Sequence, residues 1–171
     1  MRLIPLVFLV AACGGAAAES PLTVQLGLSH DATEKALKQH QFCLETSSAT
    51  IASQQQKQVY PRCNRPASED GSAWVVAVYD GDKLVELRRF ERYGDDAKAV
   101  ERWNELVSER MKTGQPSDQA LQQIKDKGLL EPGTRTVKAF TAEPGTVVGV
   151  YLLTPSPPAN ANVLEKVSIV K

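Results

Sequence analysis

The 171-residue chain has little of the chemistry from which catalytic sites are usually built. It contains only two histidines, His30 and His40, at opposite ends of an expected helix and too far apart along it to share a metal ion. The protease motif HExxH, the hydrolase motif GxSxG, the phosphate-binding P-loop and the dinucleotide motif GxGxxG are all absent. The sequence therefore predicts a protein that is not an enzyme, with no catalytic residues, no cofactor and no metal site.

Neither sign of charge is in excess. Lys and Arg together number 20, Asp and Glu together number 20, and the formal net charge is +0. A nucleic-acid-binding domain is expected to be basic, so no nucleic-acid partner is predicted. A hydrophobic content of 42% and a mean hydropathy of -0.26 are typical of an ordinary globular protein rather than a disordered or multi-span membrane protein.

The N-terminal apolar run, Leu3–Val10, is much shorter than the roughly 20 residues that a membrane-spanning helix needs. It follows the single charge of Arg2, which is the layout of a secretory signal. The next residues, Val10-Ala11-Ala12-Cys13, resemble a bacterial lipobox, in which the cysteine is lipidated and becomes the first residue of the mature chain. The resemblance implies a palmitate-type acyl anchor on Cys13.

This reading divides the chain into a signal peptide (1–12), a flexible tether beginning at the lipidated cysteine (13–21) and a single domain (22–171). In the lipoprotein pattern, Gly14 rather than Asp after the cysteine implies transfer to the outer membrane, so we expect an anchor on its periplasmic side. Signal cleavage after Ala18 is the alternative. It would release a soluble periplasmic or secreted protein that begins at Glu19.

The three cysteines support export. Once Cys13 carries the lipid, Cys43 and Cys63 remain as a pair that can form a disulfide in an oxidising compartment. They lie 20 residues apart, and closing such a loop stabilises a fold by about 3 kcal/mol in the chain-entropy model. A redox or metal role is disfavoured because the pair lacks CxxC spacing and nearby histidines.

Three stretches have the pattern of amphipathic helices. Ser29–His40 has two rival N-caps, Ser29 and Asp31, the latter with Glu34 placed for a capping box. The longest helix is expected to open at Gly94–Asp96 and to run to about Lys112. Its expected apolar stripe consists of Val100, Trp103, Val107 and Met111. A third helix should begin after Pro116–Ser117 and stop at Gly128.

The remaining segments are typical of strands and turns. The expected strands or extended segments are Phe42–Ala52, Gln58–Asn64, Ser72–Tyr79, Lys83–Tyr93, Thr134–Thr141, Thr146–Leu153 and Val163–Val170. Ser53–Lys57 is expected to be a polar turn, and Asp80–Asp82 a hairpin turn. The order predicts an α+β fold in which antiparallel sheet segments, covered on one face, pack against three helices, with one disulfide. A faint internal sequence similarity, which we call the sequence echo, links Ala36–Gln39 with Ala120–Gln123.

The densest basic cluster lies on one expected strand. Arg88, Phe90 and Arg92 share a strand face and could bind a phosphate, a glycan or an acidic partner. Such a site would place Trp74 and Tyr93 near the same surface. The alternative is a solvated strand face, with the phenylalanine in the core and the arginines paired to nearby acids.

With its lipobox, and with Leu26-Gly27-Leu28-Ser29 leading into an acidic-capped helix, the start of the chain resembles SmpA/OmlA-type small outer-membrane lipoproteins. The α-α-β order is also similar to that of β-lactamase-inhibitor-type proteins. The resemblance covers mainly residues 13–42, and it implies an accessory role in barrel assembly without assigning any functional residue. The chain departs from the short family pattern in its disulfide and its long helix.

These features predict a lipid-anchored adaptor or envelope-assembly accessory. It would act through protein–protein contacts with an envelope partner, whose identity and the chain's own oligomeric state are left open. The alternative is a secreted or anchored inhibitor of a hydrolase that binds through the loop between Cys43 and Cys63. An enzyme acting on envelope glycan or lipid has the least support, because no catalytic constellation is visible.

Overall fold

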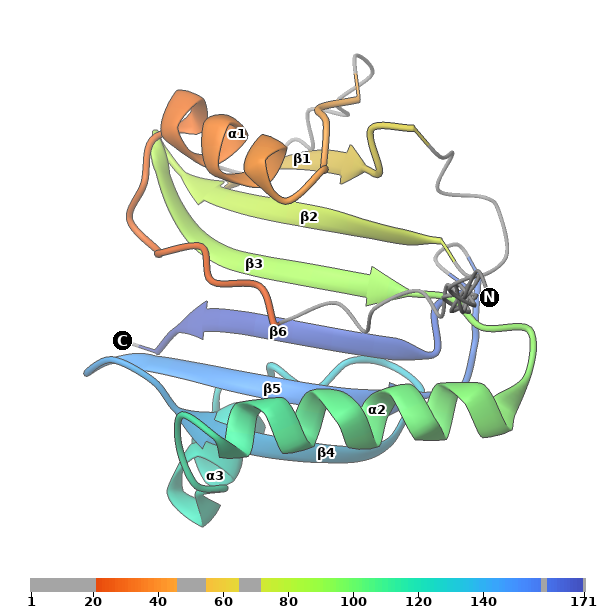
Figure 1. The fold of residues 1–171 in the computed structure, drawn as a ribbon. Coiled ribbons are helices and arrows are strands. Elements are labelled where there is room, and N and C mark those ends of the chain that lie inside the picture. Colours follow the sequence, from red (N-terminus) through yellow and green to blue (C-terminus); the bar gives the residue numbers. More distant parts are fainter. Residues whose placement is uncertain (1–20, 46–54, 65–71, 158–159, 171) are drawn as a thin grey trace, which may run out of the picture.

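The computed structural model describes residues 21–45, 55–64, 72–157 and 160–170, and the expected α+β fold is confirmed in them (Figure 1). The elements are α1 (His30–Gln39), β1 (Gln55–Pro61), β2 (Ala73–Asp80), β3 (Lys83–Glu91), α2 (Asp96–Met111), α3 (Asp118–Asp126), β4 (Thr134–Thr141), β5 (Thr146–Leu153) and β6 (Val163–Ile169).

Each helix begins at a polar cap. The side chains of Ser29, Asp95 and Ser117 each accept a hydrogen bond from a backbone N–H in the first turn of α1, α2 and α3. Such bonds satisfy donors that the helix itself leaves unpaired. Of the two candidate caps for the first helix, the structure therefore uses Ser29, and Asp31 lies in the first turn.

The six strands form one antiparallel sheet in the order β1-β2-β3-β6-β5-β4. Two three-stranded meanders, β1–β3 and β4–β6, meet where β3 pairs with β6 (Figure 1). The polar turn expected at Ser53–Lys57 is wrong for its last three residues, because β1 begins at Gln55 and Lys57 pairs with Val78. Backbone pairing to β2 makes this polar segment a strand at the side of the sheet, where polar side chains can remain in solvent.

Helices cover both faces of the sheet, so the expectation of coverage on one face is wrong. We call the face bearing α1 and α2 the front face, turned to the viewer in Figure 1, and the face bearing α3 the back face. Strand β5 shows why, because it is apolar on both sides. One side of β5 packs in the hydrophobic core beneath α2, through Val148, Val150 and Leu152. The other side packs in the hydrophobic core beneath α3, through Val147, Tyr151 and Leu153.

The buried side of α2 differs from the expected stripe. Ala99, Arg102, Leu106 and Val107 are buried, whereas Met111 is 44% exposed. The helix is thus turned so that Arg102 faces the sheet. A further core joins α1 to β1–β3 through Leu37, Tyr60 and Tyr79.

The faint sequence echo does not mark equivalent positions. Leu37 of α1 is fully buried on the front face, whereas its counterpart Leu121 of α3 is only partly buried on the back face. Among the described residues, no helix combines the length and the apolar character that crossing a membrane would require.

Candidate functional site

The predicted lipidation residue, Cys13, lies outside the described residues, which begin at Pro21. The chain is firmly held one residue later. The Leu22 N–H donates to a Glu165 carboxylate oxygen at 3.1 Å, and the Arg110 guanidinium donates to the Leu22 carbonyl at 3.2 Å. We call these two contacts the Leu22 clamp.

Residues 22–28 are part of the folded domain. Leu22 and Val24 are 4% and 7% exposed in the α1 core. Further along, Gly27 N–H donates to the Leu84 carbonyl at 2.7 Å, and Leu84 N–H donates to the Leu28 carbonyl at 2.9 Å. Figure 1 shows this segment starting on the front face, over β6 and between α1 and α2, and leading to the start of α1. The fold therefore fixes where the preceding chain joins it.

A buried charged cluster lies beneath this segment. Arg102 of α2 donates two hydrogen bonds to Glu91 of β3, at 2.8 and 3.2 Å, and Arg110 of α2 lies 2.5 Å from Glu165 of β6. Arg89 lies between the two carboxylates, at 2.9 Å from Glu91 and 3.7 Å from Glu165. The side chains of both glutamates are at most 6% exposed, so α2 is attached to the sheet by shielded ion pairs.

The electrostatics of this front cluster favour fixed charges. Burial acts to raise the pKa of Glu91, but the charges of Arg89 and Arg102 and the hydrogen bond from Tyr93 outweigh it, so the pKa is lowered. Burial and the neighbouring Glu91 raise the pKa of Tyr93. Glu91 is therefore ionised and Tyr93 neutral at pH 7. The cluster is suited to holding structure rather than to exchanging protons.

A second charged cluster lies on the back face. Arg88 pairs with Glu86 at 2.5 Å and with Glu131 at 3.3 Å, and Lys166 pairs with Glu131 at 2.7 Å. Lys166 also donates to the Leu129 carbonyl at 3.1 Å, which holds the loop after α3 against the sheet. Burial acts to raise the pKa of Glu86, but the charges of Arg88 and Lys166 outweigh it and lower the pKa.

The predicted binding residues Arg88, Phe90 and Arg92 do lie together on the back face. Arg88 pairs across the sheet with Val76, and Phe90 is 9% exposed and stacks on Trp74 with ring centroids 5.5 Å apart. The Arg92 guanidinium lies 5.7 Å from the centre of the Trp74 ring. Trp74 thus belongs to this surface.

Tyr93 does not share that surface. Its hydroxyl donates to Glu91 at 2.7 Å and so belongs to the front cluster. The acid pairing of Arg88 and the burial of Phe90 match the structural alternative for these two residues, in which the arginines pair with nearby acids and Phe90 enters the core.

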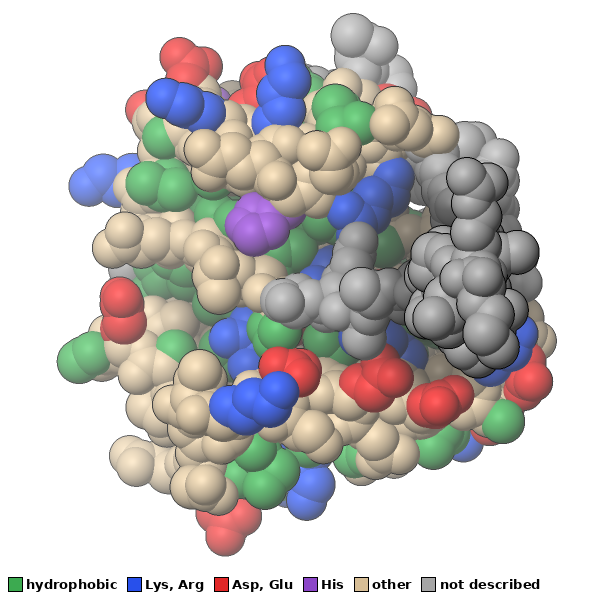
Figure 2. Space-filling view, in the orientation of Figure 1, with side chains coloured by type: hydrophobic (Ala, Val, Ile, Leu, Met, Phe, Trp, Pro, Cys, Tyr) green, Lys and Arg blue, Asp and Glu red, His purple; other side chains and the backbone are tan. Residues whose placement is uncertain are grey.

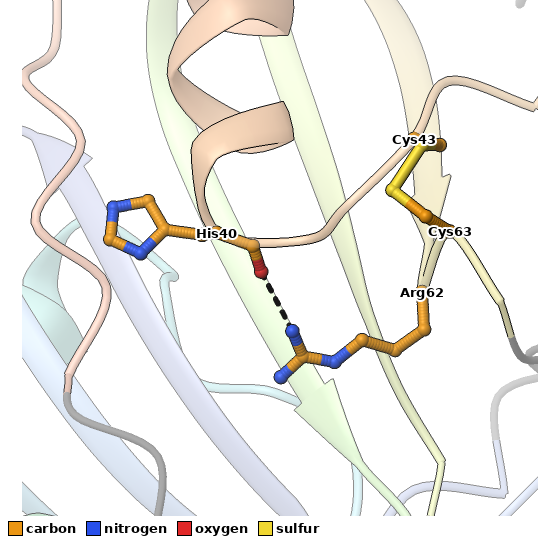
Figure 3. Close-up of a disulfide and its surroundings, with 4 residues drawn as sticks. All are labelled: His40, Cys43, Arg62 and Cys63. Atoms are coloured by element: carbon orange, nitrogen blue, oxygen red, sulfur yellow. Dashed lines mark hydrogen bonds between the residues drawn. A yellow bond between two sulfur atoms is a disulfide. The ribbon is translucent and has the colours of Figure 1, made fainter.

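The predicted disulfide is confirmed: Cys43 and Cys63 are bonded, with Cα atoms 4.8 Å apart (Figure 3). It ties the segment after α1 to the end of β1, where Cys43 N–H donates to the Pro61 carbonyl at 2.9 Å. Arg62 reinforces the junction by donating to the His40 carbonyl at 2.7 Å (Figure 3) and by lying 4.1 Å from the centre of the Phe42 ring. The expected extended segment Phe42–Ala52 falls outside the described residues beyond Glu45.

The two histidines lie at opposite ends of α1 and make different contacts. His30 stacks on Tyr79 with ring centroids 3.7 Å apart, and its backbone N–H donates to Asp82 in the β2–β3 turn. His40 is exposed at the end of α1. Within the described part of the chain, no group of three or more His, Cys, Asp or Glu residues is placed to hold a metal ion.

A shallow, open groove of about 710 Å³ runs along α2 on the front face. Its described lining residues are Ala97, Val100, Glu101, Asn104, Glu105, Ser108, Glu109 and Lys112. Figure 2 shows acidic side chains in a row over this helix. Two of these acids have internal partners, since Glu105 pairs with Arg102 and Glu109 with Lys112.

The chain matches no protein-family model, no curated protein sequence and no solved structure.

Proposed function

We propose that this protein is a lipid-anchored, non-enzymatic adaptor on the periplasmic side of the outer membrane. The lipobox at Cys13 supports the anchor, and the Cys43–Cys63 disulfide fits an oxidising compartment. The observation that carries the proposal is the position of the Leu22 clamp. Only residues 13–21 separate the predicted lipid from a point where the backbone is bonded into the fold.

A short connection to a bilayer suits an adaptor. Confinement to a thin layer raises the effective concentration toward a membrane partner, so that modest affinity is sufficient. Both strongly charged clusters on the sheet consist of mutually paired acids and bases, which is what a rigid scaffold requires.

The back face carries the proposed partner site. Val59 and Val76 are half-buried there, beside the predicted residues Arg88, Phe90 and Arg92. The Arg88 side chain is 24% exposed, and a partner's carboxylate could approach it only in competition with Glu86 and Glu131. The site therefore combines a small apolar surface with two cationic groups, and an acidic protein surface is the partner that it fits.

The test is a pull-down from mildly crosslinked native membranes, in which the recovered protein is weighed by intact mass spectrometry. A di- or triacylated mass beginning at Cys13, together with a stoichiometric envelope protein, is expected. The variant Arg88→Glu/Arg92→Glu should lose that protein. The matched control, Lys98→Glu/Lys112→Glu on exposed positions of α2, should retain it.

Equal capture by both variants would show that the partner site lies elsewhere. The anchor is tested separately by Cys13→Ser, which should leave the protein folded but mislocalised and inactive. Activity that survives without the lipid would overturn the anchored adaptor.

The second candidate function is inhibition of a hydrolase. It is favoured by the disulfide, which closes a loop of 20 residues at its base, because stiffened loops lose less conformational freedom on binding. In its secreted form this candidate predicts a mature chain that begins at Glu19. In its secreted or anchored form it predicts an activity against a soluble target that reduction of Cys43–Cys63 abolishes.

A further inference from the structure

We propose that the front face, which bears α1 and α2, is the face turned toward the lipid bilayer, and that the back face points away from it. The inference rests on the proposed lipid anchor at Cys13 and adds the orientation of the domain. It follows from where the chain enters the fold and how long the connection is.

The entry point lies on the front face between the two helices. The ion-paired side chains of Glu165 and Arg110 hold the Leu22 backbone there, Glu165 through its N–H and Arg110 through its carbonyl. The Leu22 and Val24 side chains are buried in the core below. The connection to the lipid anchor therefore joins the domain on its front face, and not at an edge or on the back.

The connection is too short to let the domain turn over. The nine residues from Cys13 to Pro21 span at most about 30 Å when fully extended. A compact domain of the about 150 residues that follow has a radius of about 19 Å, so a path from the front over the surface to the side and then straight to a bilayer at the back is about 50 Å. With the back face against the bilayer, the connection would have to be more than one and a half times its maximum length.

The α2 side of the front face does not favour adsorption to an anionic lipid surface. The groove along α2 is lined by Glu101, Glu105 and Glu109, with Lys112 at its end. Acidic groups gain nothing from an anionic surface. The length of the connection, rather than attraction between the surfaces, thus sets the orientation.

Two label sites on opposite faces test this. Ser108 is exposed on α2, and Gln119 is exposed on α3. The full chain would be produced with acylation, and its acylated mass confirmed, as Ser108→Cys or Gln119→Cys. A donor dye would be attached to the new thiol, since Cys13 is acylated and Cys43–Cys63 is bonded. Energy transfer to an acceptor dye on the headgroups of phosphatidylcholine vesicles is then measured.

Transfer from position 108 is expected to exceed transfer from position 119 roughly twofold or more, because the domain between them is about 38 Å across. A matched variant carries about 20 Gly/Ser residues inserted after Ser20. Its connection reaches about 100 Å, and the difference between the sites should vanish.

Equal transfer from an acylated protein, or higher transfer from position 119, would overturn the orientation and leave the anchored adaptor standing. A difference that survives in the lengthened variant would show that adsorption sets the orientation, and would also overturn the inference. An unacylated mass beginning at Glu19 would overturn both the orientation and the proposed anchor.

Discussion

On the front face α2 is held to the sheet by buried ion pairs in addition to apolar contacts, whereas the buried contacts of α3 on the back face are apolar. Arg102 and Arg110 attach α2 to Glu91 and Glu165. In α3 the contacts with the sheet come from Ala120 and Ile124, which are 0% and 1% exposed. The back-face ion pairs join β3 to β6 and to the loop after α3, and none of those described involves α3 itself.

The two arrangements respond differently to change. A buried ion pair adds little net stability over an apolar pair, but removal of one partner leaves an uncompensated charge. An apolar contact has no such partner to leave behind, and its loss costs transfer energy and a cavity. The front face is thus more sensitive to single substitutions and to pH, and the back face to loss of volume.

The largest effect is expected for Glu91→Gln. The change leaves Arg89 and Arg102 buried without their shared carboxylate, so the free energy of unfolding should fall by about 3–5 kcal/mol in urea titrations. Glu105 also pairs with Arg102, but its side chain is 42% exposed. Glu105→Gln should therefore change stability by no more than about 0.5 kcal/mol. Similar losses for the two variants would contradict the importance of burial.

On the back face, Ile124→Ala should cost about 2–5 kcal/mol, and Ile124→Val about 0.5–1.5 kcal/mol. The graded loss follows because this side chain is 1% exposed in the core between α3 and the sheet. Thermal unfolding measured at pH 7 and pH 5 should show the same loss at both. A loss that changed with pH would show that the packing of α3 also depends on charge.

A smaller effect is expected at the helix caps. Ser117→Ala removes the acceptor for the Ala120 N–H of α3, and Asp95→Ala removes the acceptor for the Ala97 N–H of α2. Each should cost about 1 kcal/mol. Far-UV circular dichroism during denaturation would check this, and Gln119→Ala, an exposed position within α3, is the neutral control.

The smallest effect is expected for a change of pH between 7 and 5, which should leave the free energy of unfolding almost unchanged. The pKa of Glu91 and that of Glu86 are lowered in the folded protein, so each contributes stability that is fully present above the unfolded pKa of about 4.3. This contribution is lost as the pH falls from there through the folded pKa. Between pH 5 and pH 2 the free energy of unfolding should depend on pH less steeply in Glu91→Gln than in Glu86→Gln. The reason is that Glu91 is the more deeply buried of the two.

The sequence was sufficient for the elements whose ends carry a local signal. Ser117 and Gly128 delimit α3, and the Asp80–Asp82 turn joins β2 to β3, where Gly81 adopts a positive φ of 60°. A composition rich in β-branched and aromatic residues located β4 and β5. In each case the information lies within a few residues of the element.

The first three residues of β1 and the second covered face were missed for a different reason. Gln55, Gln56 and Lys57 look like a turn, and only backbone pairing with β2 makes them a strand. The burial of both sides of β5 depends on which elements pack against it. The nearly continuous apolar run of β5 was the local signal of burial on both sides, but it does not show which helices pack there.

The front cluster was missed because charged residues are ordinarily expected at the surface. One signal was present. Arg102 and Arg110 occur at the same helical phase as the buried Ala99 and Leu106, at spacings of three and four residues. Two arginines on the apolar side of a helix indicate that the element packed against that side carries carboxylates that pair with them. The partner-binding role predicted for Arg88, Phe90 and Arg92 stays a prediction.

The strand order carries a consequence for how the chain reaches its native state. Each meander joins strands that are neighbours in sequence, so its pairings close short loops. The seam between β3 and β6, where Glu91 lies opposite Val163, joins residues far apart in the chain. The entropy of closing a loop grows slowly with its length, whereas folding rates fall steeply as contacts become less local. We therefore expect two fast-forming halves and a slow step in which the seam closes. Mutations at the seam should then slow folding more than equally destabilising mutations in β1 or β4.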